Sequence, residues 1–363
     1  MMLRITIALL LNCCALSLSA QIPLQSGFEK QEYLHLLQFN TANVDIVGYT
    51  PGIDGPPAEY TLAYRSAEIG LKNRWVHWTA EGKPDVLNVR GSIADLVSWV
   101  ANIYAAMVPA SGSLQLEKNF RFEYSLSKNP NAYVHVGWLV ATAYLSRDMM
   151  PHLQKRIAEG QRDFLLMGHS QGGAISFLLN AWIREQMRTG ALPADLRLKT
   201  YCSAAPKPGN LAFAYDFEWA NRGGWAFTVV NSEDWVPETP VTIQTVNDFH
   251  PLNPFVGARK IIRQRNLAER VVLRKIFRNL TRPTQKAQQK YEKYLGRMVS
   301  RLVRQTLPEF EQPAYVKSSM YMRAGTPVVL KPNAAYFERF RSDPEKVFVH
   351  HSLEAYYVIA EEL

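Results

Sequence analysis

Apolar runs of two lengths alternate from residue 133 onward, and their order predicts the main fold. Helix-length patterns at 133–160 and 172–190 alternate with short apolar runs at 163–168, 196–205 and 225–237. Short buried strands that alternate with helices of this length are typical of a mostly parallel sheet covered by helices. We therefore expect an open α/β architecture.

The two ends of the chain add further elements. Residues 27–45 have apolar positions at helical spacing, and residues 92–107 have a second such pattern, which ends at Pro109 and the Ser and Gly residues of 111–113. Short runs rich in β-branched and aromatic residues, bounded by Gly, Pro and Asn, predict strands at 59–66, 73–80, 84–91 and 325–333.

The N-terminus resembles a secretory signal peptide, with the basic Arg4, an apolar stretch, and small residues before Gln21. We expect residues 1–20 to be removed and residues 21–363 to form a single domain, exported to the periplasm, the cell surface or the medium. An uncleaved anchor is an alternative, but about 14 apolar-rich residues are fewer than the roughly 20 that a spanning helix needs.

Two of the three cysteines, Cys13 and Cys14, lie in this leader, where lipid modification is another alternative. Cys202 then has no partner for an internal disulfide. It lies in an apolar strand pattern, and we expect it to be a buried core residue rather than a nucleophile.

Positive charge is concentrated in one segment. Residues 258–305 contain 15 Lys and Arg against two acids, and the rest of the chain is acidic overall although the net charge is +9. We expect an insertion at about 257–312 that forms a basic helical hairpin with its hinge at Pro283. Its second helix has an apolar stripe, formed by Ala287, Tyr291, Leu295, Met298 and Leu302.

The stretch FLLMGHSQGGAISFLL, residues 164–179, places Ser170 between an apolar strand pattern and a helix pattern. Gly168 and Gly172 allow strand and helix to approach closely, so that a tight turn exposes the serine. This Gly-x-Ser-x-Gly arrangement is the nucleophile elbow of serine hydrolases with an α/β-hydrolase fold. The backbone N–H of Gln171, at the helix N-terminus, is a candidate oxyanion donor.

A serine nucleophile needs a histidine to take its proton and an acid to orient that histidine. In this fold the acid and then the base follow the serine along the chain. The stretch FTVVNSEDWVPETP, residues 227–240, ends a strand pattern, and we expect Asp234 in the loop that follows to be the acid, with Asp248 and Glu233 as alternatives. The candidate bases are His351, which we prefer, its neighbour His350, and His250.

Several ordered stretches resemble the class 3 lipase family over roughly residues 60–356. They are VLNVRGSIADLVSWV, YVHVGWL, GHSQGGA, APKPGN, VVNSEDWVPETP and HHSLEAY. The resemblance implies an α/β-hydrolase fold with Ser170 as nucleophile, Asp234 as orienting acid and His351 as general base. It also implies an oxyanion hole formed by Ser92 and the N–H of Gln171.

The helix after Ser92 corresponds, by the same resemblance, to a mobile lid. Exposed apolar residues on this helix would contact a lipid surface when it opens, although an ordinary core helix is equally consistent with the pattern. The residues in question are Ile93, Leu96, Val97, Trp99 and Val100. The basic insertion has no counterpart in compact family members; a cap over the active-site mouth, a membrane- or polyanion-binding face, and a solvated hairpin are its three interpretations.

The resemblance implies a secreted carboxylic-ester hydrolase, first of all a lipase that acts on acylglycerols through an acyl-enzyme. A phospholipase or a soluble short-chain esterase is the alternative within this chemistry, and a non-catalytic surface-binding protein is the alternative outside it. No phosphate loop, Cys/His ligand cluster or dinucleotide motif occurs in the sequence, so we expect no metal and no cofactor. The expected partners are a lipid or ester substrate and a lipid surface in transient contact, without nucleic acid or an obligate protein partner.

Overall fold

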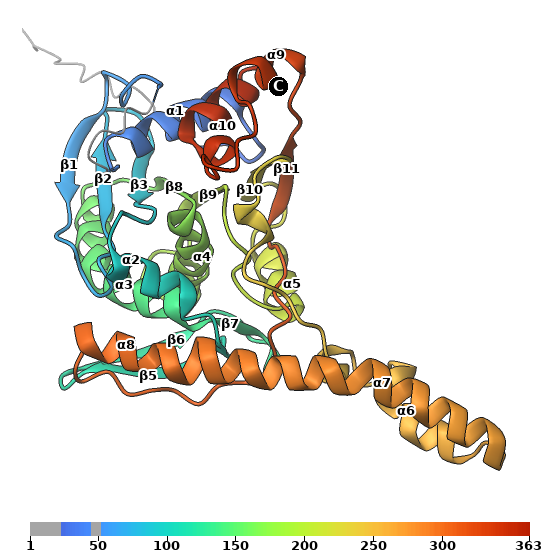
Figure 1. The fold of residues 1–363 in the computed structure, drawn as a ribbon. Helices are drawn as coiled ribbons and strands as arrows, with labels where there is room; N and C mark the ends of the chain where they lie inside the picture. The colour runs from blue at the N-terminus through green and yellow to red at the C-terminus, as the bar shows by residue number, and fades with distance from the viewer. Residues whose placement is uncertain (1–22, 45–51) are drawn as a thin grey trace, which may run out of the picture.

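The computed structural model describes residues 23–44 and 52–363 and has a seven-stranded sheet at its centre (Figure 1). The strand order is β1-β2-β3-β8-β9-β10-β11. The first three strands pair antiparallel, and β3 onward pair parallel, which confirms the expected α/β fold. The strands are β1 Thr61–Arg65, β2 Trp75–Thr79, β3 Asp85–Val89, β8 Asp163–His169, β9 Arg197–Ser203, β10 Ala226–Asn231 and β11 Thr326–Leu330.

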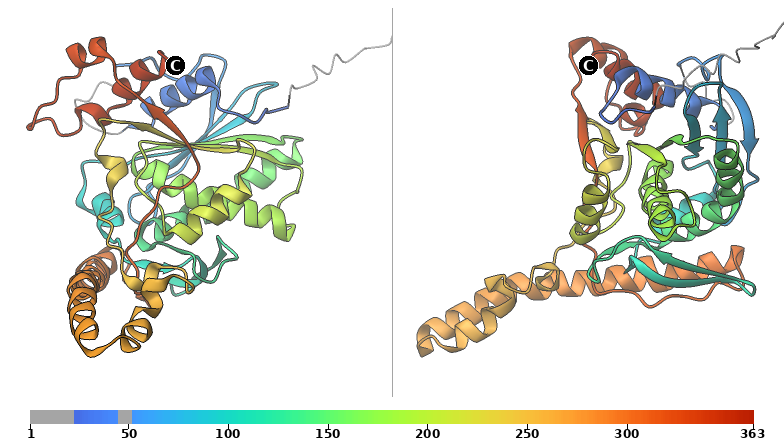
Figure 2. Two further views of the ribbon diagram at one scale, coloured as in Figure 1. Left: turned by 90° about the vertical axis from the view of Figure 1, so that its right-hand side faces the viewer. Right: turned by 180° about the vertical axis from the view of Figure 1, so that it is seen from behind.

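Helices cover both faces of the sheet, because the central strands are apolar on both sides. In β8, Phe164 and Leu166 belong to one buried cluster, while Leu165 and Met167 belong to another. Cys202 of β9 is buried in the first cluster, as expected. Figures 1 and 2 show the two helical layers: α3 Val136–Ala158, α4 Gln171–Thr189 and α5 Leu211–Ala220 on one face, and α1 Lys30–Thr41, α9 Ala334–Arg339 and α10 Leu353–Ala360 on the other.

The segment between β3 and α3 is more β-rich than the sequence pattern predicts. The helix α2 spans only Leu96–Ile103, and Pro109 ends strand β4 Met107–Pro109, which pairs with β7 Tyr133–His135. Residues 111–113 do not form a loop: they begin β5 Ser111–Glu117, which pairs with β6 Phe120–Ser125 as a hairpin. The expected break after the helix is therefore wrong; alternating inward residues such as Leu114 and Leu116 bury one face of this hairpin.

The basic insertion is helical, but its bend does not lie at Pro283. The helix α6 Pro254–Arg263 turns at residues 264–266 into α7 Leu267–Tyr291, which continues through Pro283. A proline removes one helical hydrogen bond, and water can satisfy the carbonyl that it frees on an exposed helix. The first helix pair projects away from the sheet, and the rest runs beneath it (Figures 1 and 2).

A π-helical segment, η3 Glu292–Met298, joins α7 to α8 Val299–Thr306. The wider turn shifts the buried face, so that Val299 and Val303 are buried while Met298 and Leu302, expected on the apolar stripe, are exposed. A regular helical repeat across this segment is therefore the wrong interpretation.

None of the described helices is both long and apolar enough to span a membrane. The expected signal peptide at residues 1–20 lies outside the described residues, as do the two leader cysteines.

Candidate active site

The turn between β8 and α4 places Ser170 at a sharp bend. Its backbone has φ 61° and ψ −130°, which is rare for a residue other than glycine. A Cβ on Gly168 would lie 2.2 Å from the carbonyl atoms of Gly172, and a Cβ on Gly172 would lie 2.2 Å from the carbonyl oxygen of Val89. The two glycines therefore allow the close approach that produces the bend.

Asp234 follows β10 and forms a hydrogen bond with His351. Nδ1 of His351 lies 2.7 Å from Oδ2 of Asp234, whose side chain is fully buried. The Tyr356 hydroxyl donates to the same oxygen at 2.8 Å, and the N–H of Val236 donates to Oδ1 at 3.0 Å. Because Nδ1 donates to the carboxylate, neutral His351 has its free lone pair on Nε2, the atom that can accept a proton.

Ser170 and His351 line the same cavity, which has a volume of about 290 Å³. Apolar side chains form much of the wall, including Ile93, Trp99 and Phe348. The Ser170 hydroxyl makes no hydrogen bond to any residue in 23–44 or 52–363, so it is available to an incoming group. The structure thus brings a serine, a histidine and a buried carboxylate to one edge of the sheet.

His169, at the end of β8, was not among the expected site residues and bonds to the backbone of His351. Its Nε2 donates to the His351 carbonyl at 2.8 Å, and its Nδ1 accepts from the Ser203 hydroxyl at 3.0 Å. The Tyr33 hydroxyl of α1 in turn donates to Ser203 at 2.7 Å. Burial, with a smaller contribution from His351, lowers the pKa of His169 to about 3, so this ring stays neutral and keeps one tautomer.

The alternative histidines are engaged elsewhere. His350 forms hydrogen bonds with the Tyr336 hydroxyl through Nδ1 and with the Ser342 hydroxyl through Nε2, both at 2.9 Å. His250 lies in an exposed loop, where Nδ1 accepts from the N–H of Leu252. Neither residue lines the cavity.

The alternative acids also lie apart from His351. Asp248 caps a short helical turn by accepting from the N–H of Thr245 at 2.7 Å, and it accepts from the Ser318 hydroxyl. Glu233 accepts from the hydroxyl of its neighbour Ser232 at 3.4 Å. Among the described residues, Asp234 alone of the three candidate acids bonds to His351.

Of the two expected oxyanion residues, Gln171 directly follows Ser170 in the chain, and Ser92 lines the same cavity as Ser170. Gln171 is the first residue of α4, where backbone N–H groups have no partner within the helix. Ser92 follows β3, lines the cavity, and accepts a hydrogen bond from Nδ2 of Asn102 at 2.8 Å. Because the hydroxyl of Ser92 already accepts from Asn102, its own hydrogen remains free to be donated.

The helix α2 closes one side of the cavity and has both an exposed and a buried face. Leu96 is 75% exposed and Trp99 is 38% exposed. Val100, which we expected on the exposed face, is buried, because this side of α2 packs against the main core. The Gln171 side chain ties α2 to the elbow by donating to the Ser98 carbonyl at 3.0 Å.

The basic insertion does not cover the cavity. Its lining residues come from the α1 end, the β3–α2 turn, α2, the elbow and residues 348–353, and none comes from 257–312. The interpretation of the insertion as a cap over this mouth is therefore wrong in this conformation.

Part of the chain matches a known protein family. Residues 86–244 match the family model described as Lipase (class 3). No curated protein matches the chain.

Similar solved structures are fungal lipases at low identity. A Rhizomucor miehei lipase propeptide complex is 17% identical with a TM-score of 0.41, covering 60% of this chain and 65% of that chain. A triacylglycerol lipase from Penicillium expansum is 15% identical with a TM-score of 0.42, covering 58% and 74%. Lip2 lipase from Yarrowia lipolytica is 15% identical with a TM-score of 0.45, covering 60% and 77%.

The family match contains β3 from its second residue, α2, the elbow serine and Asp234, which lie in stretches that suggested the resemblance in the sequence. His351 lies outside the matched residues. Residues 86–244 of this chain therefore match the class 3 lipase family.

Proposed function

We propose that this protein is a carboxylic-ester hydrolase that acts on acylglycerols through an acyl-enzyme. The observation that carries the proposal is the hydrogen bond between Asp234 and His351 at the wall of the cavity that also contains Ser170. The class 3 lipase match supports the same chemistry.

In the proposed mechanism, Nε2 of His351 takes the proton of the Ser170 hydroxyl as its oxygen attacks the ester carbonyl. Asp234 keeps the ring in the required tautomer and stabilises the imidazolium. The N–H of Gln171, with the N–H and hydroxyl of Ser92, donates to the oxyanion of the tetrahedral intermediate. His351 returns the proton to the leaving alcohol, and water then cleaves the acyl-enzyme by the same steps.

The cavity size favours short acyl chains while α2 stays in place. A volume of about 290 Å³ is at the lower end of typical small-molecule sites. Hydrolysis of long-chain acylglycerols would then require α2 to move, whereas hydrolysis of short-chain esters would not require this movement. Rates on p-nitrophenyl esters of increasing chain length, dispersed and emulsified, distinguish these two functions.

The central test is the replacement Ser170→Ala. We expect loss of p-nitrophenyl butyrate hydrolysis and of labelling by a fluorophosphonate probe. The far-UV circular dichroism spectrum should be unchanged, because the fold is retained. His350→Ala serves as the control, because it alters the neighbouring imidazole and should keep the label on Ser170. Substantial hydrolysis by the Ser170→Ala protein would contradict the mechanism, and a folded parent that the probe does not label would favour a non-catalytic binding function.

A further inference from the structure

The hairpin of α6 and α7, residues 254–291, has an apolar face that nothing in the described chain covers. Val272, Ile276 and Leu280 recur at steps of four on α7, and their exposed fractions are 56%, 50% and 64%. Leu273, 37% exposed, lies beside them. Aliphatic side chains arranged in this way form a continuous stripe along one side of a helix.

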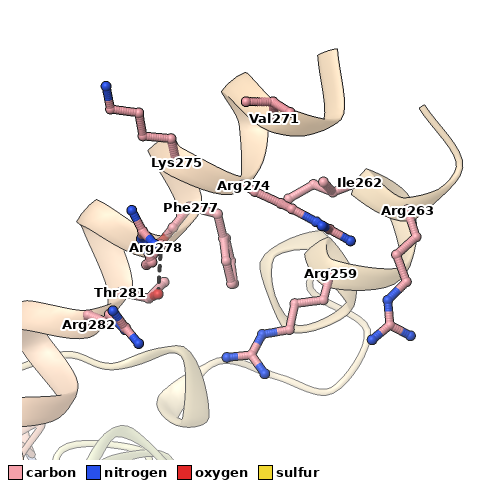
Figure 3. Close-up of a pocket in the computed structure, with 10 residues that line it drawn as sticks. All are labelled: Arg259, Ile262, Arg263, Val271, Arg274, Lys275, Phe277, Arg278, Thr281 and Arg282. Atoms are coloured by element: carbon pink, nitrogen blue, oxygen red, sulfur yellow. Dashed lines mark hydrogen bonds between the residues drawn. The ribbon is translucent and has the colours of Figure 1, made fainter. Parts of the chain in front are cut away.

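The other side of α7 is cationic and faces α6 across a cleft of about 620 Å³ (Figure 3). Arg274, Arg278 and Arg282 recur at steps of four and line this cleft from α7, and Arg259 and Arg263 line it from α6. None of these five arginines forms an ion pair with any residue that the structure describes. The only acid of the hairpin, Glu269, lies in the first turn of α7.

This concentration of like charge is unfavourable in the free protein and becomes favourable when an anionic surface binds. The apolar stripe decides what kind of anion fits. A nucleic acid or another soluble polyanion would neutralise the arginines but would leave the aliphatic residues in water. An anionic bilayer satisfies both, because an amphipathic helix lies in its interface with apolar residues inserted and cations beside the lipid phosphates.

We propose that the α6–α7 hairpin is a docking arm for bilayers that contain anionic phospholipids. The stripe on α7 enters the boundary between headgroups and acyl chains, and arginines of the cleft bind phosphate groups. The arm projects away from the sheet (Figures 1 and 2), so it can contact a membrane without involving the cavity of Ser170. This inference goes beyond the proposed hydrolysis and does not depend on it.

The test uses flotation with vesicles of phosphatidylcholine alone or with about one third phosphatidylglycerol. The parent protein carries Ser170→Ala, so that the vesicles stay intact whether or not the protein hydrolyses lipids. We expect binding to the anionic vesicles only, and weaker binding as NaCl rises from about 0.1 M to about 0.5 M. Equal binding to neutral vesicles, or binding that salt does not weaken, would overturn the electrostatic part of the proposal.

Two pairs of substitutions in the parent separate charge from apolar contact. Arg274→Gln with Arg278→Gln should weaken binding by about 25-fold, since each removed cation accounts for roughly fivefold. Ile276→Gln with Leu280→Gln should weaken it by at least about tenfold. The matched control is Leu62→Gln with Val241→Gln, two aliphatic residues that are 42% and 69% exposed outside the hairpin, and it should bind like the parent.

All four hairpin positions are exposed, so the fold should be retained; with Ser170 restored, each variant should hydrolyse a soluble ester at the parental rate. The membrane proposal is wrong if the Ile276→Gln/Leu280→Gln variant binds vesicles as tightly as the parent and heparin displaces the two proteins from vesicles equally well. In that case the hairpin is a site for soluble polyanions. If the arginine pair also binds like the parent, the hairpin is not the contact surface.

Discussion

The carboxylate of Asp234 lies 2.7 Å from Nδ1 of His351, although 117 residues separate the two along the chain. Asp234 lies in the loop that follows β10, and His351 is the last residue of the short helical turn η4 Val349–His351, which precedes α10. Asp234→Asn should lower kcat for p-nitrophenyl butyrate by about 10³–10⁴-fold, because the amide can stabilise the wrong tautomer of His351. Steady-state kinetics on the folded variant measures this loss.

Tyr356→Phe provides the control for Asp234. It removes one donor from Oδ2 but leaves the bonds of Asp234 to His351 and to the N–H of Val236. The hydroxyl also accepts from the N–H of Asn231, so two hydrogen bonds are lost. We expect a decrease of less than about tenfold in kcat, because the bond between Asp234 and His351 remains. Equal losses in the two variants would mean that Asp234 acts through the packing around Tyr356 rather than through His351.

The side chain of Gln171 should restrain α2 through its hydrogen bond to the Ser98 carbonyl. Gln171→Met keeps the backbone N–H and similar volume but removes that bond, which is worth about 1 kcal/mol. We expect faster hydrogen exchange in α2 and a several-fold rise in the palmitate-to-butyrate rate ratio. Gln289→Met, on the exposed side of α7, is the control; unchanged exchange in α2 would contradict the restraint.

Gly172→Ala should destabilise the protein by more than about 3 kcal/mol, since its Cβ would lie 2.2 Å from the Val89 carbonyl oxygen. Gly257→Ala in α6 is the matched control, because nothing lies within 4 Å of its Cβ. There the change should stabilise the helix by about 0.5–1 kcal/mol. Urea denaturation of both variants tests the comparison, and equal stability would mean that β8 and α4 can separate without cost.

Two buried histidines should make the fold sensitive to acid. Burial lowers the pKa of His135 and of His169 to about 3, against an ordinary value of 6.5. Between these values the unfolded chain binds more protons than the folded one, so stability is complete above about pH 6.5 and falls as the pH drops towards 3. Each histidine should contribute a loss of roughly 3 kcal/mol at pH 4.

His135→Asn tests this pH dependence. His135 caps α3 by accepting from the N–H of Trp138, and an asparagine can accept the same bond. The variant should have a shallower loss of unfolding free energy between pH 7 and pH 4, whatever its stability at pH 7. An unchanged slope would assign the acid sensitivity to other groups.

Elements that are buried on both faces were predictable, because their long apolar runs are compatible with few other secondary-structure assignments. The strand at 163–168 and the helix at 172–190 correspond to β8 and α4 within one residue or two. The β5–β6 hairpin was missed although its signal is present: Leu114, Leu116, Phe120, Phe122 and Tyr124 alternate with polar neighbours. A Gly and Ser cluster at its start resembled the end of a helix, and this local signal hid the alternation.

The candidate site was only partly predictable from sequence. The order of serine, acid and histidine led to Asp234 and His351, which the structure joins. The hydrogen bonds that link Tyr33 to Ser203 and Ser203 to His169 have no pattern along the chain, because they form only when α1 packs on the end of β9. The register shift at η3 also has no periodic signal, since it depends on the close contact of Gly296 with Ala106 and Tyr315.

The backbone of Ser170 has a consequence for how this chain can change over time. A non-glycine residue at φ 61° and ψ −130° costs roughly 1–3 kcal/mol, whereas glycine adopts such a conformation freely. Ser170→Gly should therefore melt at a higher temperature than Ser170→Ala, and a lower melting temperature would show that the bend is not strained. Thermal stability thus favours glycine at this position, whereas ester hydrolysis requires serine. A descendant of this chain that is no longer selected for ester hydrolysis would become more stable by replacing the serine with glycine.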